Sequence, residues 1–247
     1  MRAVTDPLAP LLGLPGVAEA AEAARREVDR LLTHSSMRKH GTSVAVEAGL
    51  RCARASAALE GHDVPLAALR AEVPDDPVVR GALRVAAELR PLVETWEHAP
   101  AQALARMHTL AASGLAEGDE LGRPRAGAEV AARIATLVDV LGRTTVPAVV
   151  VAGVVHGELL GLAPFAHANG VVARAAARVV LVARGLDPRA VSAPDVGCAR
   201  DPDAYTRAAA AFAGGDVSAF LVLWCEAVAH GAVEGIAIGE ALLRGEG

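Results

Sequence analysis

Residues 163–174 read Ala-Pro-Phe-Ala-His-Ala-Asn-Gly-Val-Val-Ala-Arg, between an apolar run opened by Pro147 and a helical run that stops before Gly185. This arrangement predicts a helix, a short loop and a second helix. At Asn169-Gly170 the loop turns into the second helix, where free backbone amides and the helix dipole favour an anion. The stretch therefore predicts an anion-binding loop, although an Asn-Gly turn before a helix is also ordinary turn chemistry.

Two arginines, Arg174 and Arg178, lie one turn apart on the helix that follows this loop. Side chains of a helix lean towards its N-terminus, so Arg174 is placed to meet an anion held by the loop. Arginines on an alanine-rich helix are also common on solvated faces. From this segment alone, both interpretations stay open.

Helical patterns and their breaks extend over the rest of the chain, and the sequence shows no repeat and no persuasive strand pair. Gly61 and Gly185 suit left-handed helix ends, and Pro91 is expected to break a helical stretch. The fold class is therefore predicted to be all-α. The expected helical stretches are Pro15–Thr33, Ser43–Leu59, Pro77–Leu89, Ala99–Gly114, Glu129–Leu141, Pro147–Leu160, Val171–Ala183, Asp201–Phe212 and a long C-terminal helix.

Composition excludes several classes of partner. Apolar residues make up 53% of the chain and aromatic residues only 2%, so Ala, Val and Leu must fill a core of closely packed helices. A formal net charge of -5 gives no general attraction to nucleic acid. Charged residues interrupt the most apolar segments, so no membrane span is expected. Three scattered cysteines and an N-terminus without a signal-peptide pattern predict a cytoplasmic protein without a metal site.

The loop and its flanks resemble the signature of Fic-domain proteins, HPFxxGNGRxxR. Pro164, Phe165, Asn169, Gly170 and Arg174 match it. The resemblance covers roughly residues 100–230, and it implies a Fic-like helical bundle with an N-terminal helical extension. The expected division is an N-terminal helical portion at residues 1–98 and a Fic-like core with C-terminal helices at residues 99–247. The further matching segments are Leu104 to His108, His156 to Leu159, Arg184 to Pro188, Ala204-Tyr205 and Gly215 to Phe220.

Competent Fic enzymes transfer AMP from ATP to a protein hydroxyl, and this chain departs from their motif at four positions. The histidine that takes the hydroxyl proton is Ala163, and the acid that binds magnesium is His167. Ala168 replaces a glycine, and Val171 replaces the first motif arginine. Loss of a general base typically removes about 10²–10⁴ in rate, so AMP transfer is not expected here. Magnesium is not expected either, because a hard cation prefers oxygen ligands.

A second resemblance lies upstream, in Ser56-Ala-Ala-Leu-Glu60-Gly61. Many Fic proteins carry an inhibitory helix with the pattern Ser/Thr-x-x-x-Glu-Gly/Asn, whose glutamate pairs with the second motif arginine. The resemblance therefore implies a pair between Glu60 and Arg174. Once catalysis is lost, such a pair can also be structural and join the N-terminal helices to the core.

The family's substrate-docking flap, a β-hairpin that follows a Gly-x-x-Arg element, is also expected to be short or absent. Gly122-Arg-Pro-Arg125 is similar to the start of that region, but Ala126 to Glu129 lead into the next predicted helix almost at once. Such flaps align a peptide by strand addition. A reduced flap argues against a protein substrate, independently of Ala163.

The preferred hypothesis is a degenerate Fic protein, inactive in AMP transfer, that binds a nucleotide or another anion. Phe165, Asn169, Gly170 and Arg174 would form the site, with ATP or ADP as the candidate ligands and no certain cofactor. A repurposed scaffold that acts on a small molecule is the first alternative, with His167, Glu158 or His156 as acid or base. A structural or interaction module is the second, with a homodimer through the apolar C-terminal helix.

Overall fold

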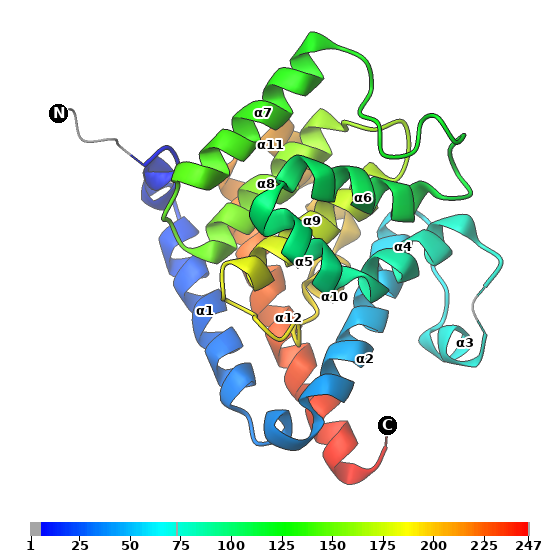
Figure 1. Cartoon of the computed structure of the whole chain (residues 1–247). Coiled ribbons are helices and arrows are strands. Elements are labelled where there is room, and N and C mark those ends of the chain that lie inside the picture. The colour runs from blue at the N-terminus through cyan, green and yellow to red at the C-terminus, as the bar shows by residue number, and fades with distance from the viewer. Residues whose placement is uncertain (1–5, 73, 247) are drawn as a thin grey trace.

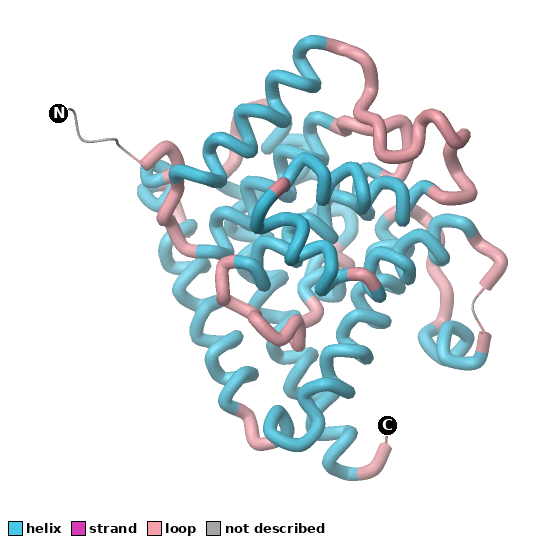
Figure 2. The backbone as a smooth tube through the Cα atoms, in the orientation of Figure 1, coloured by secondary structure: helices cyan, strands magenta, loops and turns pink. Residues whose placement is uncertain are grey.

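The computed structural model describes residues 6–72 and 74–246. These residues form one short 3-10 helix and twelve α-helices, with no β-strand among them, which confirms the predicted all-α class (Figure 1, Figure 2). The elements are the 3-10 helix Ala9–Gly13, α1 (Val17–Thr33), α2 (Ser36–Leu59), α3 (Leu66–Ala71), α4 (Pro77–Ala87), α5 (Leu89–His98), α6 (Pro100–Ala112), α7 (Ala128–Arg143), α8 (Ala148–Leu162), α9 (Asn169–Ala183), α10 (Pro194–Cys198), α11 (Pro202–Ala213) and α12 (Ser218–Arg244).

The long helix α12 crosses much of the molecule and packs against α1, α2, α8, α10 and α11 (Figure 1). By length and composition α12 is apolar enough to span a membrane, and half of its most apolar window is buried inside the protein. Its Trp224 ring is fully buried, and the indole Nε1 donates a hydrogen bond to the Val149 carbonyl at 3.0 Å. The packing of α12 is that of a central core helix.

Small residues fill the core, as the composition requires. One continuous hydrophobic core extends from Val17 of α1 to Ile238 of α12, so it crosses the predicted division at residues 98 and 99. All three cysteines are buried and free. Burial raises the pKa of the Cys52 thiol to about 12, which keeps it protonated and unreactive.

Close approach of α12 to the segment before α10 requires glycine at position 231. An added Cβ at Gly231 would overlap the backbone of Ala193 and Pro194. The Gly231 carbonyl also accepts a hydrogen bond from the Ala193 amide at 2.9 Å. This contact fixes the loop that carries α10 against the central helix.

Two local expectations were wrong. Helix α2 begins at Ser36, seven residues before the expected start at Ser43. Pro91 does not break a helix but lies in the first turn of α5, where a missing backbone N–H costs nothing. The chain instead bends at Glu88, and α5 forms because Leu89, Leu92 and Trp96 bury one face at helical spacing.

The hairpin expected to be short or absent does not form in the segment that joins α6 to α7. Within the described residues this segment contains only an isolated bridge between Ser113 and Ala116. Figure 2 shows it as a long irregular loop. The chain therefore offers no strand edge here to which a peptide could add.

The Gly231 contact gives a test of the packing. We expect Gly231→Ala to lower the free energy of unfolding by about 1–3 kcal/mol, because the new methyl group has no space. Gly142→Ala is the matched control, since nothing lies within 4 Å of a Cβ there, and it should raise stability by about 0.5 kcal/mol. Urea denaturation measures both changes, and equal effects would contradict the close approach.

Candidate functional site

The loop between α8 and α9 is held in shape by its own backbone and by one amide side chain. Ala163 and Ala168, which bound the loop, have left-handed backbones with φ of 43° and 56°. The Asn169 side chain accepts a hydrogen bond from the Phe165 amide at 2.9 Å and donates one to the Phe165 carbonyl at 2.8 Å. The Asn169 side chain therefore closes the loop through both of its polar atoms, and this fixes the direction in which α9 begins.

The segment before α7 supports the loop from outside. The Arg125 guanidinium donates to the Ala163 carbonyl at 2.8 Å and to the Leu162 carbonyl at 3.0 Å, and the Arg125 amide donates to the Pro164 carbonyl at 2.7 Å. These contacts satisfy carbonyl groups at the end of α8 that have no helical partner. Phe165 is buried and its ring stacks on His108, with centroids 4.1 Å apart. Phe165 thus anchors the loop and presents no open face to a ligand.

Arg174 lies at the centre of the site and is only 1% exposed. Its Nε donates to Ser56 Oγ at 2.8 Å, and one terminal nitrogen donates to the Ser56 carbonyl at 3.0 Å and to Glu60 Oε1 at 2.6 Å. The other terminal nitrogen donates to the Tyr205 hydroxyl at 3.3 Å. Burial opposes the charge, but Tyr205 and Glu60 outweigh it and raise the pKa of Arg174. The guanidinium thereby joins α2, α9 and α11.

Glu60 follows the last residue of α2 and reaches the start of α9. Its carboxylate lies directly over Gly170, where an added Cβ would overlap Glu60 Oε1. The next residue, Gly61, has a φ of +90°, so the chain turns away as soon as the carboxylate is in place. A carboxylate of the protein itself therefore occupies the position at the helix N-terminus that would favour an external anion.

A buried chain of two hydrogen bonds leads from Arg174 through Tyr205 to His156. Because Arg174 donates to the Tyr205 oxygen, the Tyr205 O–H is free to donate to His156 Nε2 at 2.7 Å. His156 has no exposed surface and packs edge-on against Phe220 and Trp224. Burial, together with the nearby Arg174 charge, holds the pKa of His156 well below its usual range. The ring is neutral and structural.

The three candidate acid–base residues do not converge on one point. His156 is in the core, and Glu158 is engaged by Arg133 in a two-pronged ion pair with both distances at 2.8 Å. His167 is exposed on the loop. The buried Val171 occupies the position of the first motif arginine and offers no charge.

The residues present do not fit a magnesium ion. The loop at residues 163–168 contains no carboxylate, and its only side chain with a ligand atom is His167. Among the described residues no group of three His, Cys, Asp or Glu side chains is close enough to hold a metal. A hard cation that needs several oxygen ligands has no such set here.

Comparison with solved structures places the fold. A Fic family protein from Desulfovibrio desulfuricans has a TM-score of 0.75 and 20% identity, over 90% of this chain and 74% of that one. Fic-1 from C. elegans has a TM-score of 0.70 and 17% identity, over 92% and 73%. A Fic domain containing signaling protein from Bacteroides thetaiotaomicron has a TM-score of 0.59 and 14% identity, over 90% and 98%. The chain therefore has a Fic-like fold.

No family model and no curated protein matches the sequence. The departures at Ala163, His167, Ala168 and Val171 remove four positions of the short motif on which the resemblance rests. Asn169 and Phe165, which shape the loop, are among the motif positions that match.

The buried histidine gives a pH-dependent stability. In the folded chain His156 stays neutral, but in the unfolded chain it takes up a proton as the pH falls below about 6.5. The unfolded state then binds more protons, so the free energy of unfolding falls by up to about 1.4 kcal/mol per pH unit. His156→Gln, which can still accept the Tyr205 hydrogen bond, should show a smaller fall between pH 7 and 5. The difference between the two urea-denaturation profiles measures the contribution of His156, and superimposable slopes would contradict it.

Proposed function

We propose that this chain is a catalytically degenerate Fic-like protein that binds ATP or ADP weakly, with its own Glu60 competing for the binding position. The observation that carries the proposal is the carboxylate of Glu60, which lies over Gly170 and 2.6 Å from Arg174. A helix N-terminus carries roughly half a positive charge, which a phosphate or a carboxylate can neutralise. Glu60 supplies that negative charge internally.

Arg174 keeps most of its hydrogen bonds when the Glu60 carboxylate moves away. Ser56 and Tyr205 hold Arg174 through three hydrogen bonds that do not involve the carboxylate. The Glu60 side chain is 31% exposed and is followed by Gly61, so it is less confined than the guanidinium it contacts. A phosphate that displaces the carboxylate would therefore meet an arginine already oriented towards the start of α9.

Catalysis has little support in this geometry. Ala163 has no group to accept a proton, and Arg125 already uses its carbonyl. His156 and Glu158 are committed to Tyr205 and Arg133. A general base must lie within hydrogen-bond reach of the proton it removes, and no side-chain hydrogen bond among the described residues orients the ring of the exposed His167. Binding without group transfer is the function that these contacts favour.

Removal of the internal carboxylate should strengthen nucleotide binding. We expect Glu60→Gln to raise the affinity for ADP by about tenfold, because the ligand no longer displaces a charged partner of Arg174. Asp63→Asn is the matched control: Asp63 lies close by in sequence, loses the same charge and pairs with Arg54 instead. Isothermal titration calorimetry at low ionic strength compares the three proteins. Equal affinities for Glu60→Gln and Asp63→Asn would contradict the competition.

The same protein preparations can be assayed for catalysis. The assay measures transfer of labelled AMP from ATP to protein in the presence of magnesium. Neither the wild type nor Glu60→Gln is expected to label itself or an added protein above background. Labelling by the wild type at a rate that Ala163→His does not increase would show that the chain catalyses transfer without the family's base. That result would overturn the degenerate assignment while leaving the binding experiment intact.

A further inference from the structure

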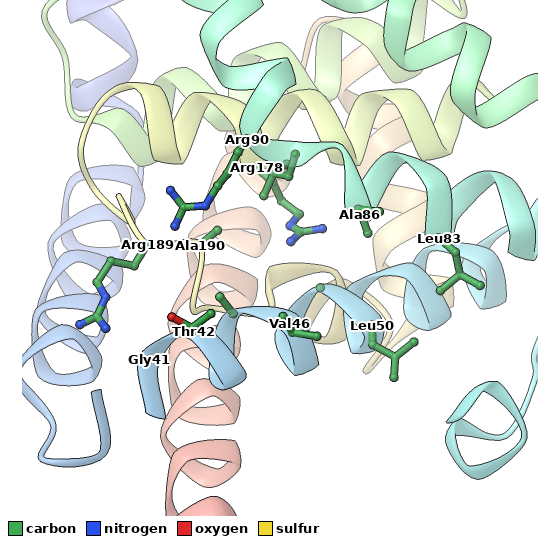
Figure 3. A pocket seen from close by; sticks show the side chains of 14 residues that line it. Gly41, Thr42, Val46, Leu50, Leu83, Ala86, Arg90, Arg178, Arg189 and Ala190 are labelled. Carbon is green, nitrogen blue, oxygen red and sulfur yellow. The ribbon is translucent and has the colours of Figure 1, made fainter. Parts of the chain in front are cut away.

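A separate cavity of about 460 Å³ lies between α2, α4, α5, α9 and the loop that follows α9 (Figure 3). Its size falls within the roughly 300–1,000 Å³ of small-molecule sites. Its lining includes neither Glu60 nor Arg174, and no residue of the loop at residues 163–168. The cavity is therefore a different site from the one at the start of α9.

The two ends of this cavity differ in chemistry. One wall is apolar and is formed by Val46, Leu50, Leu83 and Ala86. Figure 3 shows the side chains of Arg90, Arg178 and Arg189 gathered towards the other end. An occupant that fits both ends has an apolar body and an anionic group.

Arg178 is the strongest sign that the cationic end is built for a ligand. It is 6% exposed, and its guanidinium points into the cavity (Figure 3). Within residues 6–72 and 74–246 it forms no hydrogen bond and no ion pair. Burial opposes the Arg178 charge, but neighbouring groups, Asp195 and Asp187 among them, raise its pKa. The charge is thus kept at the cavity while its donors stay without a hydrogen-bonded partner among the described residues.

Two buried acids lie near Arg178 but do not pair with it. Asp187 accepts hydrogen bonds from the Val191 amide, the Ser192 amide and the Ser192 hydroxyl. Burial raises the pKa of Asp195, although Arg178 works in the other direction, and no hydrogen bond joins the two side chains. With Arg90 and Arg189 added, the positive charges outnumber the negative ones at this end.

The other two arginines leave donors for an anion. Arg189 uses one terminal nitrogen to donate to the Met37 carbonyl at 2.7 Å, and it lies so close to Gly41 that a Cβ there would overlap the guanidinium. Arg90 is exposed at the mouth and has no hydrogen bond among the described residues. At the opposite rim Val46 is 70% exposed.

We propose that this cavity binds a small amphipathic carboxylate of the medium-chain fatty acid type. The carboxylate lies against Arg178, whose forked donors match its two oxygens, and Arg90 and Arg189 flank it. The alkyl chain covers the apolar wall and the exposed face of Val46. A polyphosphate fits less well, because most of the lining is apolar and Asp187 lies beside the cationic end.

Binding of decanoate, decanol and butyrate tests the cationic end and the apolar wall of the cavity separately. Isothermal titration calorimetry with the full chain should show that decanoate binds at least about tenfold more tightly than either of the other two ligands. Decanol lacks the charge, and butyrate lacks the long alkyl chain. Equal affinity for decanoate and decanol overturns the assignment of the cationic end. No binding of decanoate at millimolar concentration overturns the proposal.

Variants at the two ends of the cavity identify its residues. Arg178→Met removes the charge and keeps an unbranched side chain of similar length, so decanoate should bind about tenfold more weakly. Circular dichroism checks that this variant stays folded, because Asp195 loses a nearby positive charge. At the exposed rim, Val46→Glu should weaken decanoate binding by repulsion, and Val46→Lys, equally polar, should weaken it less. Equal losses for the two rim variants would contradict an anionic ligand. Glu60→Gln should leave decanoate affinity unchanged, which separates this site from the nucleotide site.

Discussion

The buried guanidinium of Arg174 is the contact on which the rest of the site depends. A buried charge is costly unless its donors are satisfied, and for Arg174 α2 supplies Ser56, the residue after α2 is Glu60, and α11 supplies Tyr205. These partners come from segments more than a hundred residues upstream and about thirty residues downstream of Arg174. One side chain of α9 therefore fixes the end of α2 and the position of α11. The need for glycine at position 170 follows, because the Glu60 carboxylate occupies the space of a side chain.

The loop and the chemistry expected of it are separable in this chain. Asn169, Phe165 and Arg125 shape the loop through backbone hydrogen bonds and ring stacking, and none of these contacts needs a catalytic base or a metal. The helix–loop–helix geometry therefore does not require a proton acceptor at position 163 or an acid at position 167. In the proposed function, the retained part is the positive end of α9 and the arginine beneath it.

The sequence predicted those parts of the structure that follow from local rules or from a motif. Gly61 and Gly185 both have positive φ, as expected for helix ends, and the upstream Ser-x-x-x-Glu pattern correctly identified Glu60 as the partner of Arg174. The support of the loop by Arg125 was missed, because a single arginine in a polar turn carries no signal of a contact with residues far along the chain. Arg178 was compatible with a solvated face, but in the structure α4, α5 and the loop after α9 bury it. Such burial depends on how the helices pack, which periodicity alone does not specify.

A double-mutant cycle on the free energy of unfolding tests most directly whether Glu60 and Arg174 form the contact that joins α2 to α9. The cycle compares the wild type, Glu60→Gln, Arg174→Met and the double variant, so that the loss of the Ser56 and Tyr205 contacts cancels. The structure predicts a coupling free energy of about 1–3 kcal/mol, because the pair is short and one partner is fully buried. A coupling free energy indistinguishable from zero would show that the Glu60–Arg174 pair does not hold the two helices together.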